Sequence, residues 1–137
     1  MKKIFLISFL ALLTMFTHAQ TDAKIMLGSN GLAIDSVSNT GSETWTLKVP
    51  GFQKTVAVQF IATKISGTVA GTVTLQGSLN GTSWSAVPGQ STFTATDVAS
   101  QNTLWKIDSS GFLYYRVSWT GTGTMSASAR AYLLARD

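Results

Sequence analysis

Residues 68–84 read TVAGTVTLQGSLNGTSW, and this stretch indicates the fold class. From Val69 to Leu79, apolar residues or glycine occupy every second position, and mostly threonine, serine or glutamine fill the positions between them. This period of two is typical of an antiparallel strand with one buried and one exposed face. Asn80-Gly81 follows and gives the strongest short hairpin signal, because both central residues of a type I′ turn need positive φ. The stretch therefore predicts a β-hairpin.

A two-residue turn also fixes the predicted register of this hairpin. It pairs Gly77 with Trp84, so that the indole ring lies on the apolar face above a glycine. We therefore expect Trp84 in the core. The other three tryptophans take the apolar side of their strands and are also expected in the core: Trp45, Trp105 and Trp119.

The same alternation returns over residues 113–119 and 125–133, with Gly121-Thr122-Gly123 between them. A loop of three residues keeps both apolar sets on one face, whereas a loop of two residues would put one set on the wrong face. We therefore expect a second hairpin in which Trp119 lies opposite Met125. In this pairing large side chains meet small ones, as a close-packed core prefers.

The second hairpin gathers aromatic and basic side chains on its outer face. Tyr114 is expected opposite Arg130. Phe112 is expected opposite Tyr132. The candidate ligand-binding residues are Phe112, Tyr114, Arg116, Arg130 and Tyr132. Such an exposed aromatic and basic patch is typical of a binding surface, and the alternative is that a second sheet or a neighbouring subunit covers it.

Other parts of the chain show the same short strands and no helical spacing of apolar residues. Further strands are expected over residues 23–27, 32–37, 43–49, 54–65, 91–96 and 102–107. Turns with Gly, Pro, Asn or Asp chemistry are expected at residues 28–31, 39–42, 50–51, 88–90 and 108–111. The pattern predicts an all-β fold, an antiparallel and jelly-roll-like β-sandwich of about eight to ten short strands.

The first 19 residues have the three parts of a secretory signal peptide. Lys2 and Lys3 precede an apolar run over residues 4–16, and small residues lead to a cut before Gln20. The run is shorter than the roughly 20 residues that span a bilayer. We expect a signal peptide over residues 1–19, a single β-sandwich domain over residues 20–137, and a secreted or cell-surface protein. The Ala-Gln junction after a Lys-Lys leader resembles signal peptides of Bacteroidetes-type bacteria.

Loss of this leader changes the composition of the 137-residue chain. It leaves 118 residues, removes the single histidine, and lowers the net charge from +4 to about +2. With no cysteine either, the expected mature chain lacks Cys and His nucleophiles, His general bases, Cys/His zinc sites and disulfides. We expect no enzyme, no cofactor and no metal site. The 97–102 loop offers oxygen atoms, but its spacing matches no known calcium loop.

The basic residues are scattered singly, which argues against nucleic acid as a partner. No other apolar run predicts a membrane span in the mature protein. Edge strands rich in threonine, serine and valine, with few charges, favour pairing between copies of the chain. We therefore expect a homo-oligomer or a filament.

Residues 72–84, TVTLQGSLNGTSW, resemble a recurrent hairpin in small virion proteins of tailed bacteriophages. Tyr114-Tyr115-Arg116-Val117 and Gly121-Thr122-Gly123 follow in the order seen there, so the resemblance covers residues 56–134. It implies a β-sandwich used in capsid decoration, head fibres or tails. Discoidin-like carbohydrate-binding sandwiches have a similar hairpin with a following tryptophan.

Three functional hypotheses follow. The first is an exported, non-enzymatic structural or surface-coating protein that acts by self-association. The second is a carbohydrate or cell-surface binding module that uses the outer aromatic patch to bind a surface glycan. The third is a structural component of a phage virion.

Overall fold

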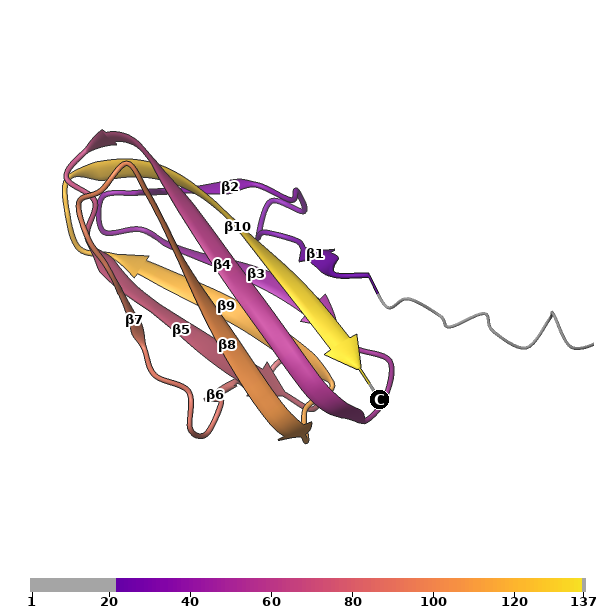
Figure 1. The fold of residues 1–137 in the computed structure, drawn as a ribbon. Coiled ribbons are helices and arrows are strands. Elements are labelled where there is room, and N and C mark those ends of the chain that lie inside the picture. Colours follow the sequence, from indigo (N-terminus) through magenta and orange to yellow (C-terminus); the bar gives the residue numbers. More distant parts are fainter. Residues whose placement is uncertain (1–21, 137) are drawn as a thin grey trace, which may run out of the picture.

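The computed structural model describes residues 22–136, and in this range the chain forms two antiparallel sheets packed face to face (Figure 1). The first, called here the β4 sheet, contains β1 (Lys24–Met26), β2 (Asp35–Ser38), β10 (Met125–Arg136), β4 (Gln53–Gly67) and β8 (Ser100–Ser110). The second, the β9 sheet, contains β3 (Ser42–Lys48), β9 (Tyr114–Gly121), β5 (Gly71–Ser78), β6 (Ser85–Ala86) and β7 (Phe93–Ala95).

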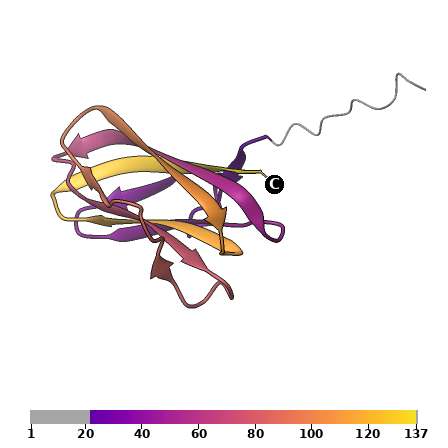
Figure 2. The same ribbon diagram turned by 60° about the horizontal axis from the view of Figure 1, so that its bottom comes forward.

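One edge of each sheet is formed by two short strands that lie one after the other along the same neighbour. β1 and β2 pair with successive parts of β10, and β6 and β7 pair with successive parts of β5. The strand orders are therefore β1/β2-β10-β4-β8 and β3-β9-β5-β6/β7. The chain changes sheet after nearly every position, which is the jelly-roll arrangement, and Figure 2 shows the two layers in a second orientation. The predicted all-β, jelly-roll-like sandwich is confirmed.

The core is centred on Phe60 of β4, which lies between two tryptophans of the opposite sheet. Its ring centroid is 5.6 Å from that of Trp45 and 5.7 Å from that of Trp119, both in edge-on geometry. All three side chains are fully buried. Buried alanines of β10 (Ala127, Ala129 and Ala131) add small side chains to this core, as close packing around large rings requires. The predicted burial of Trp45, Trp105 and Trp119 is confirmed.

The predicted hairpin between residues 113–119 and 125–133 is wrong. β9 pairs with β3 and β5, whereas β10 pairs with β4, so the two strands face each other across the core. Both apolar sets still point inward, because each strand buries the expected side against the other sheet. The chain passes from one sheet to the other after Gly121. The N–H of Gly121 donates to the carbonyl of Gly41, and a Cβ added to Gly121 would collide with the carbonyl oxygen of Asn39. The glycine serves a close approach of backbones and not a hairpin turn.

The predicted two-residue turn at Asn80-Gly81 is also wrong. Gly77 pairs with Ser85 and not with Trp84, so the loop is longer than expected. Gly81 has a φ of 77°, but Asn80 has no positive φ, so a type I′ turn does not form. Instead the Asn80 side-chain oxygen accepts hydrogen bonds from the backbone N–H groups of Thr82 and Ser83, each at 2.9 Å. The side chain thus competes with the hairpin for the local backbone donors.

This longer loop changes the environment of two predicted core residues. Trp84 is only partly buried, and Leu79 is 64% exposed. The remaining members of the same apolar series, Val69, Val73 and Leu75, are buried as predicted.

The sheet edges are short or partly covered. At the β3 edge, Leu27 and Thr46 exchange two backbone hydrogen bonds of 3.2 and 2.8 Å. At the β8 edge, the amide of Gln90 donates to the carbonyl of Lys106 at 3.0 Å, and the indole of Trp105 donates to the carbonyl of Ser91 at 2.9 Å. The other two edges carry strands of two to four residues. Natural sheets limit edge-to-edge pairing in these ways.

The predicted signal peptide, residues 1–19, lies outside the described residues and stays a prediction. No helix within residues 22–136 has the length and apolar character needed to cross a membrane.

Replacing Phe60 with alanine is expected to destabilise the fold by about 3–5 kcal/mol, because a large aromatic group is removed from between two buried tryptophans. Urea unfolding followed by tryptophan fluorescence measures the change. Gln59→Ala, at the adjacent exposed position of β4, is the matched control and should change the free energy of unfolding by less than about 0.5 kcal/mol. Similar losses in both variants would contradict the central role of Phe60.

Candidate ligand-binding surface

The structure separates the five predicted ligand-binding residues. Tyr114 and Arg116 lie at outward positions of β9, in the β9 sheet. Arg130 and Tyr132 lie at outward positions of β10, in the β4 sheet. The predicted single patch is therefore wrong, because the two pairs lie on opposite outer faces of the sandwich.

Phe112 does not join either face. It lies just before β9 and packs against the edge of the core, with its ring 6.1 Å from that of Tyr115 in edge-on geometry. The space it occupies exists because Gly77 has no side chain, since an added Cβ there would lie 2.5 Å from the Phe112 ring. The sequence prediction had assigned this space to Trp84.

Trp84 instead stacks with Arg116 on the outside of the β9 sheet. The guanidinium carbon of Arg116 lies 4.3 Å from the centre of a Trp84 ring. The same guanidinium donates through Nε to the side-chain oxygen of Gln76 at 2.8 Å. Partial burial lowers the pKa of Arg116 from its usual value, although an arginine stays charged. Two partners thus hold the Arg116 cation over an indole ring.

Tyr114 lies one outward position along β9 from Arg116. The ammonium group of Lys48, on the neighbouring strand β3, is 5.5 Å from the centre of the Tyr114 ring. Gly81 of the loop before β6 also packs on the Tyr114 ring, since an added Cβ would lie 3.2 Å from Cε1 of Tyr114. We call the set Lys48, Gln76, Trp84, Tyr114 and Arg116 the Trp84–Tyr114 surface.

Hydroxyl groups border the Trp84–Tyr114 surface. The outward positions of β3, β9 and β5 that continue from it carry only serine and threonine: Ser42, Thr44, Thr46, Thr72, Thr74, Ser118 and Thr120. Two of them, Ser42 and Thr120, are joined by a hydrogen bond of 3.1 Å. Rings, charged donors, an amide and hydroxyls are therefore combined on one sheet face.

A hollow of about 330 Å³ lies next to this surface, at one end of the sandwich. Lys48 lines both features. Leu47 and Leu133 supply apolar walls from the two sheets, and Asp22 and Lys24 stand at its rim. It extends the region in which a ligand could contact Lys48.

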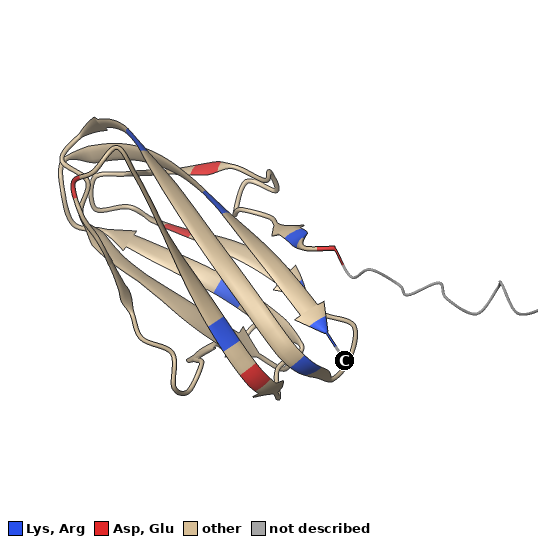
Figure 3. Ribbon diagram, in the orientation of Figure 1, with Lys and Arg blue, Asp and Glu red and all other residues tan. Residues whose placement is uncertain are grey.

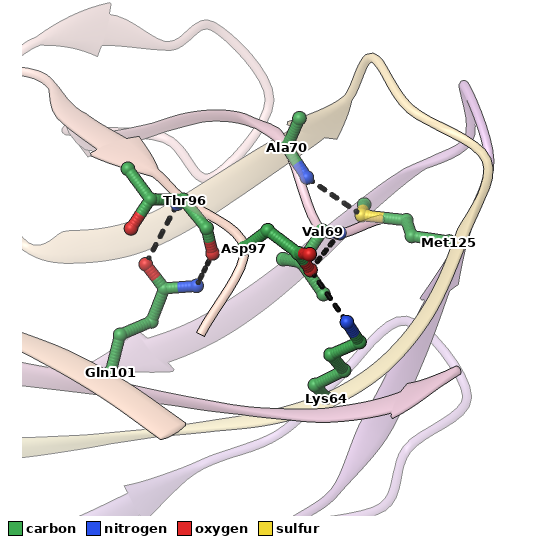
Figure 4. A network of polar contacts seen from close by, with 7 residues as sticks. All are labelled: Lys64, Val69, Ala70, Thr96, Asp97, Gln101 and Met125. Carbon is green, nitrogen blue, oxygen red and sulfur yellow. Dashed lines mark hydrogen bonds and ion pairs between the residues drawn. The ribbon is translucent and has the colours of Figure 1, made fainter. Parts of the chain in front are cut away.

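Asp97, one of the acids considered for calcium, is used within the fold. Figure 4 shows its carboxylate between Lys64 and the backbone of Val69. The oxygen Oδ1 lies 2.8 Å from Nζ of Lys64 and accepts from the Val69 N–H at 2.9 Å. Nearby, the Gln101 amide makes two hydrogen bonds with the backbone of Thr96. These contacts tie the loop before β8 to the end of β4 and to the connection between β4 and β5.

The chain matches no family model and no curated protein sequence. Similar solved structures exist for the fold. The mitogen derived from Yersinia pseudotuberculosis has a TM-score of 0.53 and 9% identity, over 85% of this chain and 89% of that chain. A carbohydrate-binding module, CBM4, has a TM-score of 0.50 and 14% identity, over 87% of this chain and 81% of that chain.

A domain of tailspike protein 4 from bacteriophage CBA120 has a TM-score of 0.48 and 9% identity, over 82% of this chain and 18% of that chain. At these identities the comparisons with the mitogen and with CBM4 show a shared β-sandwich fold and nothing further. The virion role implied by the sequence resemblance stays a prediction, and so does the absence of enzymatic activity.

Asp97→Asn is expected to lower the midpoint of thermal unfolding at neutral pH. The hydrogen bonds from Lys64 and from the Val69 N–H lower the pKa of Asp97 below its usual value, so the folded state binds this proton less tightly than the unfolded chain. The stabilisation is therefore present above the unfolded pKa of about 3.9 and is lost as the pH falls through the folded pKa. Wild type and variant should converge in acid, as measured by differential scanning calorimetry between about pH 2 and pH 7.

Asp108→Asn is the matched control for this experiment. Asp108 also pairs with a lysine, Lys106 at 3.2 Å, but both side chains are about two-thirds exposed. Its loss should change the midpoint little at any pH. A difference for Asp97→Asn that stays constant with pH would contradict the assignment.

Proposed function

We propose that the protein is an exported, non-enzymatic carbohydrate-binding module and that the Trp84–Tyr114 surface is its binding site. The observation that carries this proposal is the Trp84 ring, partly exposed on a sheet face and held by Arg116 at 4.3 Å. An outward-facing tryptophan among hydroxyl and amide groups needs a reason other than core packing.

Sugars suit the chemistry of this surface. A pyranose ring has an apolar C–H face that packs on an aromatic ring, and a rim of hydroxyls that need donors and acceptors. Trp84 and Tyr114 offer the rings. Gln76, Arg116 and the neighbouring threonines offer the polar partners.

The surface is also organised before a ligand arrives. Arg116 is fixed by Gln76 and by Trp84, and Gly81 packs on Tyr114. Side chains that are already ordered lose little conformational entropy on binding, which favours affinity for a flexible oligosaccharide. The fold shared with CBM4 is compatible with this proposal, but the support comes from the side chains.

A second candidate is self-association into a surface coat. Sheet edges give it little support, since they are short or partly covered, but the outer face of the β4 sheet favours it. Leu104, Gln59, Tyr132 and Ile25 form one row across this face, and Leu104 and Ile25 are 64% and 41% exposed. Exposed apolar side chains such as Leu104 and Ile25 often mark contacts between proteins.

The first experiment tests glycan binding. Wild-type protein is screened on a glycan array, and the best oligosaccharide is titrated by calorimetry. Trp84→Ala should weaken binding about fivefold to tenfold, because one stacked ring contributes about 1 kcal/mol. Trp84→Phe should recover part of the affinity.

Tyr132→Ala is the matched control, since it removes an outward aromatic ring from the opposite face. It should leave the affinity unchanged. No glycan bound by wild type, or equal losses in Trp84→Ala and Tyr132→Ala, would overturn the proposed site.

The second experiment tests self-association by sedimentation velocity over a range of concentrations. Wild type should form oligomers. Leu104→Lys should shift them toward monomers, because a charged side chain replaces an exposed apolar one on this face. Thr120→Lys, at an exposed position on the β9 sheet, is the control and should leave the distribution unchanged. A wild-type protein that is monomeric at every concentration would exclude the coat.

A further inference from the structure

The outer face of the β9 sheet carries positive charge without a compensating acid. Its outward positions on β3, β9 and β5 contain Lys48 and Arg116, and their other residues are uncharged. Glu43, the single acid on these strands, lies on the inward side of β3 and bonds with the hydroxyl of Ser29. Figure 3 shows basic residues on both sheets, so this face is distinguished by the placement of its two cations beside aromatic rings.

Only one of the side-chain nitrogens of Arg116 has a hydrogen-bond partner within the described residues. Among residues 22–136, it forms no ion pair, and its one side-chain hydrogen bond is from Nε to Gln76. The two terminal nitrogens of the guanidinium therefore have no protein acceptor in this range. Partial burial has already removed part of the water around the charge, as the lowered pKa reflects. A planar guanidinium in this state matches a bidentate anion such as a carboxylate.

Lys48 adds a second cation on the same side. Lys48 lies opposite Tyr114 in the β3–β9 pairing, and its ammonium group lies over the tyrosine ring. Tyr114 is in turn one outward position along β9 from Arg116. The rings of Trp84 and Tyr114 thus each lie beside a cation. Such an arrangement suits a chain of sugars whose apolar ring faces stack on Trp84 and Tyr114 and whose acidic groups contact the two cations.

The opposite outer face lacks this combination. Arg130 there is exposed and has no aromatic ring stacked on it within the described residues. Lys106 on that side is already paired with Asp108. Arg130 therefore serves as a control residue, because it has the same charge as Arg116 but lies outside the Trp84–Tyr114 surface.

We infer that the ligand of the Trp84–Tyr114 surface is an acidic polysaccharide whose anionic group is bound by Arg116. This inference rests on the proposed carbohydrate-binding function and specifies the class of sugar. The anionic group is a carboxylate or a sulfate ester, which share the ability to accept two hydrogen bonds from a guanidinium.

The experiment compares matched ligands by titration calorimetry with the purified protein. The probes are an oligogalacturonate, the same oligosaccharide after reduction of its carboxyl groups, and a sulfated galactan oligosaccharide. We expect an acidic probe to bind roughly tenfold or more tightly than the carboxyl-reduced one, and its affinity to fall in about 0.5 M salt. Preference for the galacturonate identifies a carboxylate, and preference for the sulfated galactan identifies a sulfate.

Variants connect the preference to Arg116. Arg116→Gln should remove most of the difference between acidic and reduced probes while retaining binding of the reduced probe by Trp84. Arg116→Lys keeps the charge but loses the planar fork, so it should give an intermediate preference. Arg130→Gln should leave the preference intact. Thermal unfolding of each variant shows whether the domain remains folded.

The outcomes separate the two proposals. Equal affinity for acidic and reduced probes, with Trp84→Ala still reducing binding, overturns the acidic-sugar inference and leaves the carbohydrate-binding function standing. Binding of none of these probes or of any array glycan overturns the function itself. Equal losses in Arg116→Gln and Arg130→Gln would assign the preference to net charge. Tighter binding of polyglutamate or single-stranded DNA than of any acidic glycan would overturn the sugar class.

Discussion

The contact of Phe60 with Trp45 and Trp119 is the constraint on which the rest of the structure depends. It joins the two sheets at their centre, and it is formed although Nε1 of both tryptophans is buried without a hydrogen-bond partner within the described residues. An unpaired buried donor costs about 1–3 kcal/mol, which the burial of two indole rings offsets. Because Trp45 and Trp119 must point inward, the alternate positions of β3 and β9 must point outward. The direction of Lys48, Tyr114 and Arg116 follows from that register.

The alternation of apolar residues predicted which face of each strand is buried, and it failed to predict which strand is the neighbour. Val117 and Ala129 are both buried, as expected, but they belong to different sheets. A period of two has the same form whether two strands lie side by side or face each other across a core. The connection decides between them, and here the close approach of Gly121 to Asn39 selects the crossing.

The candidate site was predictable in part for the same reason. Tyr114 and Arg116 lie within a regular strand, where parity fixes direction, and both point outward as predicted. Trp84 lies in a loop, where the side chain of Asn80 binds two backbone N–H groups and lengthens the turn. Phe112 precedes β9, so the space left by Gly77 decides its direction. The signal that was available for Trp84 is the pair Ser78 and Asn80, two side chains able to accept from local N–H groups.

The position of β10 has a consequence for the order of folding. Among the strands of residues 22–136 this one comes latest, yet it lies inside the β4 sheet, between β4 and the two short strands β1 and β2. During synthesis, β4 therefore lacks one neighbour and β1 and β2 lack their only sheet partner until β10 emerges. Pairing between strands that are far apart in the sequence is slow, so β1, β2 and β4 stay without this partner until β10 has been synthesised. For a protein that we propose is exported, this delay keeps the β4 sheet incomplete until β10 is made.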